Sequence, residues 1–210
     1  MSAPPNTNRG STSRGSRTRT RLLQVATEVF AEHGYHEASI VKITTAAQVA
    51  QGTFYLYFSS KQQVFEEVVR DLNSRVRRAM HEASSAQRGR LAAERAGFGA
   101  FFRFTAQNPA LYRIMRQAEF VAPDVLHVHY ETIARGYISG LTSAQERGEV
   151  APDLDPEVTA WALMGIGELV GMRWVTWSES DAAPQDLPPE VFESIMLLIE
   201  RALAPGEDRQ

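Results

Sequence analysis

Apolar residues recur at intervals of three and four positions along most of the chain, which is the spacing of an α-helix with one buried face. No segment shows the strict alternation of apolar and polar residues that is typical of a half-exposed strand. The chain is therefore predicted to be all-α. We expect helices over approximately residues 18–33, 40–47, 51–57, 61–81, 90–107, 109–121, 123–147, 156–177 and 190–204.

The two shortest predicted helices, 40–47 and 51–57, lie on either side of Gln48-Val49-Ala50. Two short helices joined by a tight turn form a helix-turn-helix, whose second helix fits the major groove of DNA. Phe54 and Phe58 are four positions apart, so they share one face and would anchor that second helix to a core. We therefore predict an N-terminal three-helix domain containing the helix-turn-helix, followed by a larger C-terminal helical bundle.

The second short helix carries side chains of the kinds that contact nucleic acid. Glutamine can read an adenine edge, and the hydroxyl groups of threonine and tyrosine are common phosphate contacts. A glycine lets the backbone approach another surface closely. A serine cap before the first short helix, with its backbone amides, and a lysine after the second could each hold a phosphate. The candidate DNA-binding residues are Ser39, Gln51, Gly52, Thr53, Tyr55, Tyr57 and Lys61.

Residues 51–61, which read QGTFYLYFSSK, resemble the recognition helix of the TetR (tetracycline-repressor-like) family of bacterial transcription regulators, and the likeness covers about residues 18–65. It departs at Gln48, where the family usually has glycine, and at Ala50, where it usually has serine or threonine. The resemblance implies a ligand-responsive repressor, not an enzyme. Such a protein binds a palindromic operator as a homodimer formed through its last two helices, and its effector occupies a pocket in the C-terminal domain.

This reading divides the chain into four parts. Residues 1–17 have almost no apolar content and are rich in serine, threonine, glycine, proline and arginine, so we expect a disordered basic arm. That arm is either a solvated tail or an additional contact to DNA. Residues 18–61 form the DNA-binding domain, 62–204 the effector-binding and dimerisation domain, and 205–210 a tail.

Charge is distributed unevenly along the chain, although the net charge is only −3. Residues 1–78 hold 11 lysines and arginines against 6 acids, and residues 79–210 hold 11 against 19. A basic front and an acidic back would orient the protein toward a polyanion. The chain has no cysteine and no apolar run long enough for a membrane span, so we expect a cytoplasmic protein that does not bind membranes.

Aromatic residues, methionines and a few polar groups on the later helices could line an apolar pocket for a lipophilic or acyl-type effector. The same spacing also fits an ordinary core. His127 and His129 are two apart and would point to different sides of a helix, so we expect no metal site, and no cofactor. The candidate pocket residues are Phe102, Tyr112, Met115, Arg116, Glu119, His127, Tyr130, Trp161, Glu168 and Trp174.

Three alternatives remain open from the sequence. The chain could be a helical protein-interaction module without specific DNA binding, or an enzyme built on a helical bundle. The enzyme would need a converging acid–base pair, and neither G-x-S-x-G nor H-E-x-x-H occurs. Within the regulator class, the helical body could respond to a protein and not to a small molecule.

Overall fold

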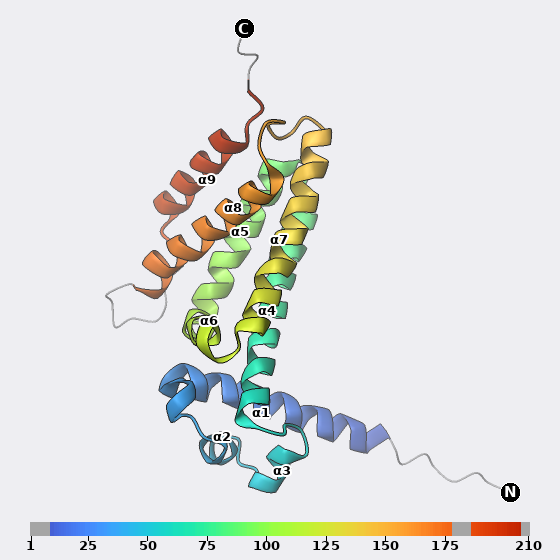
Figure 1. Ribbon diagram of the computed structural model, residues 1–210, viewed down its shortest axis with the longest axis vertical. Helices are drawn as coiled ribbons and strands as arrows, with labels where there is room; N and C mark the ends of the chain where they lie inside the picture. Colours follow the sequence, from blue (N-terminus) through green and yellow to red (C-terminus); the bar gives the residue numbers. More distant parts are fainter. Residues whose placement is uncertain (1–8, 178–185, 207–210) are drawn as a thin grey trace, which may run out of the picture. The chain divides into compact units, whose positions relative to one another are not determined.

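The computed structural model describes residues 9–177 and 186–206 (Figure 1). Residues 1–8, 178–185 and 207–210 lie outside the described residues, and with them most of the expected tail and parts of the expected N-terminal arm and of the loop before the last helix. All regular structure in the described ranges is helical, which confirms the all-α prediction. The elements are α1 (Arg9–Glu37), α2 (Ile40–Ala46), α3 (Gln51–Tyr55), α4 (Lys61–Ser85), α5 (Arg90–Gln107), α6 (Ala110–Val121), α7 (Pro123–Glu146), α8 (Pro156–Gly171), the π-helix η1 (Met172–Thr176) and α9 (Pro189–Leu203).

The chain folds into two compact units. The first contains the chain up to Asp71 together with Arg113–Val125, and the second contains Leu72–Tyr112 and the chain from Leu126 onward. The polypeptide therefore leaves the first unit in α4 and returns to it in α6. The sequence led us to place the boundary between the DNA-binding domain and the helical body after residue 61. It carries no sign that the short segment Arg113–Val125 packs with the N-terminal helices.

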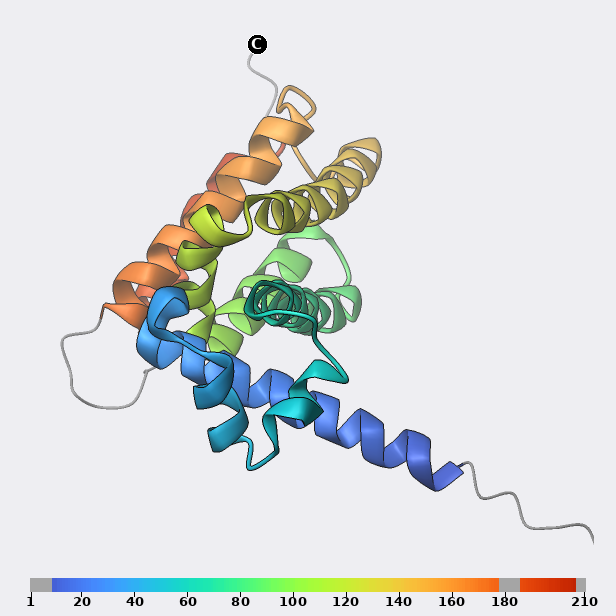
Figure 2. The same cartoon turned by 60° about the horizontal axis from the view of Figure 1, so that its bottom comes forward.

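The first unit is built around a core of aromatic and aliphatic side chains from α1, α3 and the start of α4. Figure 2 shows α2 and α3 joined by a short turn beside α1. Phe54 and Phe58 are 0% and 1% exposed, so they anchor α3 as predicted. The Phe30 and Phe65 rings meet edge to face with centroids 5.0 Å apart, a favoured aromatic geometry.

The helix-turn-helix has the caps that its sequence predicts. Ser39 is the N-cap of α2, and its Oγ accepts a hydrogen bond of 3.1 Å from the amide of Lys42. Gln48 in the turn has a φ of 56°, a conformation that glycine adopts more easily. Ala50 is the N-cap of α3 and makes no side-chain hydrogen bond there. Both departures from the family pattern therefore fall at positions with a defined backbone requirement.

The start of α1 differs from the prediction. We expected the helix to begin near Thr18, but it begins at Arg9, so residues 9–17 are helical and do not belong to a disordered arm. Extending an existing helix fixes one residue for each hydrogen bond gained, and arginine is a good helix former. The expected break at Gly34 is confirmed by its φ of 76° and ψ of 163°, although the assigned helix extends to Glu37.

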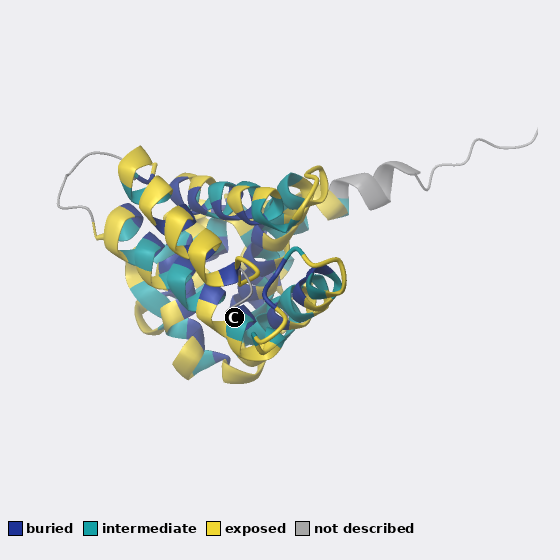
Figure 3. Ribbon diagram, turned by 90° about the horizontal axis from the view of Figure 1, so that it is seen from above, coloured by how far each residue is buried: buried dark blue, intermediate teal, exposed yellow. Residues whose placement is uncertain are grey.

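The second unit has a core formed by α5, α7, α8 and α9, which Figure 1 shows and whose buried positions Figure 3 colours dark blue. Asp155 caps α8, since its Oδ1 accepts a hydrogen bond of 2.9 Å from the amide of Val158. The predicted helix 156–177 is interrupted, because α8 ends at Gly171 and continues as η1. A Cβ at Gly171 would overlap the hydroxyl group of Tyr112, so this glycine permits a close approach of side chain to backbone.

No helix in the described ranges combines the length and the apolar character that crossing a membrane requires.

We predict that Ala50→Ser stabilises the protein by about 0.5–2 kcal/mol, because serine would supply the missing cap of α3. Thermal unfolding measures this as a higher melting temperature. Ala46→Ser, the same change at the last residue of α2, is the control and should be neutral or slightly destabilising. An unchanged or lower melting temperature for Ala50→Ser would contradict this N-cap position.

Candidate nucleic-acid interface and ligand cavity

The face of α3 opposite its phenylalanine anchor is open. Gln51 and Gly52 are exposed, Tyr55 is 53% exposed, and Thr53 and Tyr57 are half-buried. No heavy atom lies within 4 Å of the place where a Cβ at Gly52 would sit, so another surface could approach the backbone at this point. The structure thus presents five of the predicted DNA-binding residues on or directly after one short, anchored helix. This arrangement suits an element that enters a groove.

Lys61 is placed differently from our expectation. Its ammonium group donates hydrogen bonds to the carbonyl oxygens of Tyr35 (2.8 Å), His36 (3.3 Å) and Ala38 (2.9 Å). The same group lies 4.4 Å from the centroid of the Tyr35 ring, within cation–π range. An ammonium group has three donors, and all three are directed to these carbonyls. Lys61 therefore holds the chain that links α1 to α2 against the start of α4, and the structure does not support a direct phosphate contact.

Two glutamines that the sequence analysis did not single out add to this junction. Gln117 on α6 accepts a hydrogen bond of 2.6 Å from the backbone amide of Tyr35, and its amide group donates to the carbonyl of Phe30 at 3.3 Å. Gln62 on α4 accepts from the Tyr35 hydroxyl at 2.8 Å and donates to the carbonyl of Val121 at 2.7 Å. The end of α1, the start of α4 and α6 are joined through these side chains within the first unit.

Basic side chains lie on α1 and α2 around the helix-turn-helix. Arg21 is exposed and donates a hydrogen bond of 3.3 Å to the side-chain oxygen of Gln48, and Lys42 is exposed on α2. Arg19 forms an ion pair with Glu67. A Cβ placed on Gly15 would lie 3.5 Å from the hydroxyl group of Tyr57, so the N-terminal extension of α1 passes beside the residues that follow α3. Arg17, in this extension, thus adds positive charge on the helix that passes the candidate DNA-binding face.

The predicted pocket residues do not form one site. Within the second unit, the Tyr130 hydroxyl donates a hydrogen bond of 3.0 Å to the carboxylate of Glu168, and the Tyr112 hydroxyl donates to the Glu168 carbonyl at 3.2 Å. Burial, together with the nearby Glu168 carboxylate, raises the pKa of Tyr112. The Trp161 ring lies 6.2 Å from that of Tyr130. Phe102 is 2% exposed and packs beside Gly171, so it belongs to the core.

The other five predicted pocket residues lie elsewhere. Met115, Arg116 and Glu119 belong to the first unit, and His127 and Trp174 are exposed. Helical spacing alone could not separate these residues from those around Glu168, because the division of the chain between two units follows from contacts distant in sequence.

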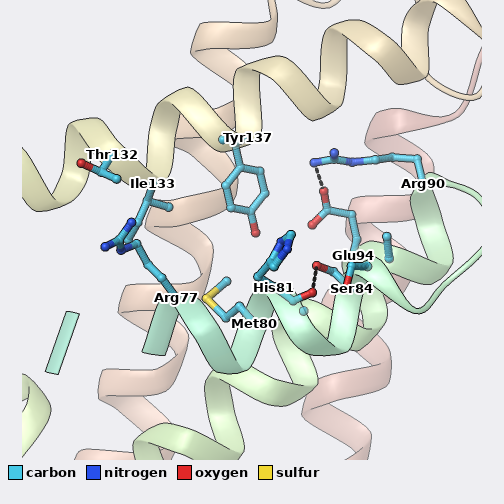
Figure 4. Close-up of a pocket in the computed structure, with 13 residues that line it drawn as sticks. Arg77, Met80, His81, Ser84, Arg90, Glu94, Thr132, Ile133 and Tyr137 are labelled. Atoms are coloured by element: carbon cyan, nitrogen blue, oxygen red, sulfur yellow. Dashed lines mark hydrogen bonds and ion pairs between the residues drawn. The ribbon is translucent and has the colours of Figure 1, made fainter. Parts of the chain in front are cut away.

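The structure shows a cavity of about 320 Å³ in the second unit, between α4, α5 and α7 (Figure 4). Its lining includes Arg77 from α4, Arg90 and Glu94 from α5, and Ile133 and Tyr137 from α7. None of the ten predicted pocket residues is part of this lining. The sequence offered one signal that we did not use, namely polar residues and glycines at helical spacing on faces that an ordinary core would fill with large apolar side chains.

The described residues contain no cluster of three or more histidines, aspartates and glutamates that could hold a metal ion.

We predict that Lys61→Met lowers the free energy of unfolding by about 1.5–3 kcal/mol, because methionine keeps the aliphatic length but leaves carbonyl groups without their charged donor. Urea denaturation measures this loss. Lys42→Met is the matched control, since the Lys42 ammonium bonds one carbonyl, that of Glu37, at 3.0 Å; it should change stability by less than about 0.5 kcal/mol. Equal effects of the two substitutions would contradict the role assigned to Lys61.

Comparisons with known proteins agree with this geometry. Residues 22–68 match the model of a family described as bacterial regulatory proteins, tetR family. The chain is 29% identical over 205 residues to a Bacillus subtilis protein named as the uncharacterized HTH-type transcriptional regulator YdgC, covering 93% of this chain and 98% of that one.

Two solved structures share the fold. GusR from Salmonella enterica superposes with a TM-score of 0.74 at 24% identity, covering 89% of this chain and 95% of that one. The regulator FadR from Bacillus subtilis, in complex with stearoyl-CoA, also superposes with a TM-score of 0.74, at 21% identity, covering 88% and 98%. The segment that matches the family model, residues 22–68, contains α2, α3 and the start of α4. It therefore includes the exposed face of α3. Residues 22–68 of the chain therefore carry the DNA-binding domain of the tetR family of bacterial regulatory proteins.

Proposed function

We propose that the chain represses transcription by binding a palindromic operator as a homodimer and that an effector bound in its helical body releases the operator. The observation that carries this proposal is the open polar face of α3, backed by the fully buried Phe54 and Phe58. A short helix that is rigidly anchored on one side and hydrogen-bonding on the other is suited to reading a major groove.

The residues on this face differ in what they would contribute. Gln51 at the start of α3 is exposed and has an amide that can bond an adenine edge in bidentate fashion, so it would read a base. Thr53, Tyr55 and Tyr57 would contact phosphates through their hydroxyl groups. The backbone amides at the start of α2, after Ser39, would bind another phosphate. Lys61 would act indirectly, by holding the junction beside α3.

A homodimer follows from the symmetry of a palindromic site, whose half-sites must each receive one recognition helix. The structure supports a subunit contact through α8 and α9, because both helices expose large apolar side chains. On α8, Val158 is 68% and Leu169 63% exposed, and on α9, Leu197 is 47% and Leu198 56% exposed. Apolar surface of this kind is typical of an interface. The partner that fits it is a second copy of this chain.

An effector acts only if its affinity differs between the operator-binding conformation and another conformation, since equal affinity shifts neither population. The structural neighbour FadR, solved with stearoyl-CoA, supports an effector of lipophilic or acyl type. Such a regulator works where the chromosome lies, in the cytoplasm. Nothing in the comparisons favours a helical interaction module without specific DNA binding.

We predict that Gln51→Ala relaxes base preference at one position in each half-site, because alanine cannot make the bidentate bond. The measurement is competition binding with operator probes that carry single base replacements, and discrimination at that position should fall by about 1–3 kcal/mol. Tyr57→Phe is the contrasting variant and should weaken binding to all probes alike. An unaltered preference profile for Gln51→Ala would show that this residue does not read a base.

We predict that Leu197→Glu converts the dimer to monomers and thereby weakens operator binding, since a charge would have to be buried in an apolar contact. Sedimentation velocity at micromolar protein measures the change in mass. Val128→Glu is the control, because Val128 is an exposed apolar residue (60%) on α7, a helix outside the proposed subunit contact; this variant should remain dimeric. A dimeric Leu197→Glu protein would argue against a subunit contact at this position of α9.

A further inference from the structure

The cavity between α4, α5 and α7 differs from ordinary core packing in its charge, its polar atoms and its size. We propose that it binds a small monocarboxylate with an apolar body, as the free acid. The inference rests on the proposed function, since it assigns this acid to the effector class of the repressor.

The charges in the lining favour a single negative charge on the ligand. Arg90 forms an ion pair with Glu94, which is 3% exposed, so these two charges compensate each other. Arg77 also lines the cavity, and its guanidinium group makes no ion pair within the described part of the chain. Figure 4 shows Arg77 and Arg90 at opposite sides of the lining, with the Tyr137 ring between them. The unmatched positive charge lies at the Arg77 side, where a carboxylate would be attracted.

Polar atoms without partners occur on the same three helices. Among the described residues, the buried side-chain atoms that lack a hydrogen bond are Asn73 Oδ1 on α4, Arg90 Nε on α5 and His129 Nδ1 on α7. Asn73 precedes Arg77 by one helical turn, and His129 precedes Ile133 by one turn, so both lie on the faces that carry lining residues. Buried polar atoms are almost always bonded, and exceptions are expected where a ligand or a water molecule supplies the partner. Of these three residues Arg90 lines the cavity, so its Nε is the unpartnered atom that a polar occupant would bond.

The protonation state of His129, which lies one turn before the lining residue Ile133, leaves Arg77 as the positive charge on that side of the cavity. Burial, reinforced by the positive charge of Arg77, lowers the pKa of His129 to about 4, so the ring is neutral at pH 7. A neutral imidazole can donate one hydrogen bond without adding a second positive charge. Arg77 would then be the group that compensates the carboxylate, and this side chain is accessible at the surface.

The remainder of the lining and the volume define the body of the ligand. Met80, Ala93, Ile133 and the ring of Tyr137 are apolar surfaces in the cavity. Burial, followed by the Glu94 charge, raises the pKa of Tyr137, so its hydroxyl group stays protonated as the partner of Glu94. The volume of about 320 Å³ is at the lower end for small-molecule pockets. It fits a medium-length alkyl chain or one aromatic ring, but it is too small to enclose a CoA thioester.

The test uses the full-length protein and four probes, namely decanoate, 4-phenylbutanoate, 1-decanol and decanoyl-CoA, with binding measured by isothermal titration calorimetry. We expect at least one of the two acids to bind, and 1-decanol and decanoyl-CoA to bind at least about 10-fold more weakly than the better acid. Arg77→Gln should weaken binding of that acid about 10- to 100-fold, as expected when a charge-assisted hydrogen bond is lost, and should leave 1-decanol unaffected.

Two further variants make the result specific. Arg78→Gln makes the same change at the neighbouring exposed arginine, which is not part of the lining, and should bind the acid like the wild-type protein. Ile133→Trp fills the cavity and should abolish binding of the acid, while a melting temperature and a circular-dichroism spectrum near those of the wild type show that the variant is folded. Absence of binding by both acids, or wild-type binding by Arg77→Gln and Ile133→Trp, would overturn the proposal.

Operator binding separates this inference from the proposed function. Fluorescence anisotropy of a labelled operator should fall when the bound acid is added to the wild-type complex, and Arg77→Gln should require correspondingly more acid. An acid that binds through Arg77 without releasing the operator would overturn its role as effector. Failure of both acids to bind, with the operator still bound tightly and specifically, would overturn the site and leave the DNA-binding function intact.

Discussion

The Lys61 ammonium group and the three carbonyl oxygens around it form the interaction on which the DNA-binding unit depends. Gly34 breaks the regular geometry of α1, and Lys61 bonds the carbonyl groups of Tyr35, His36 and Ala38 in the chain that follows. Because Lys61 is the first residue of α4, this contact fixes the start of α4 against the chain leading into α2. The short helix α3 lies between these two points in the sequence, so the Lys61 contact also helps to fix the position of α3.

The same junction includes α6, which connects the unit to the ligand-responsive part of the proposed mechanism. Gln117 hydrogen-bonds the backbone at Tyr35 and Phe30, and Gln62 hydrogen-bonds the backbone at the end of α6. Each of α4 and α6 contains residues of both compact units. A ligand in the second unit that favoured a different arrangement of α4 would therefore act on a helix whose first residue helps to hold α3. Its effect on operator affinity is limited by its difference in affinity for the two conformations.

Local chemistry was readable from the sequence. Ser39 caps α2 because its side-chain oxygen bonds the amide three residues later, and Phe54 and Phe58 share one buried face because they are four positions apart. The family resemblance placed α3 correctly, since it rests on a contiguous motif. These features depend on neighbours within a few residues, which a sequence pattern shows directly.

Features that depend on distant contacts were missed. The role of Lys61 depends on carbonyl groups more than twenty residues away in the sequence. No pattern of side chains in the sequence indicates such a contact. The π-helix at Met172 replaces the expected continuation of α8, as shown by the hydrogen bond from Trp177 N to Met172 O at 2.9 Å, and its residue types do not distinguish it from an α-helix. The cavity is lined by arginines, a glutamate and glycines among other residues, whereas the aromatic and polar residues expected to line a pocket are not part of this lining.

Selection of bound DNA from a random pool, carried out at two salt concentrations, tests the central claim most directly. The account predicts a palindrome with two related half-sites about one helical turn apart, bound less tightly at the higher salt concentration because phosphate contacts release counterions. Weak binding that yields no sequence motif and does not respond to salt would contradict it, because the open face of α3 would then not be an operator-reading surface.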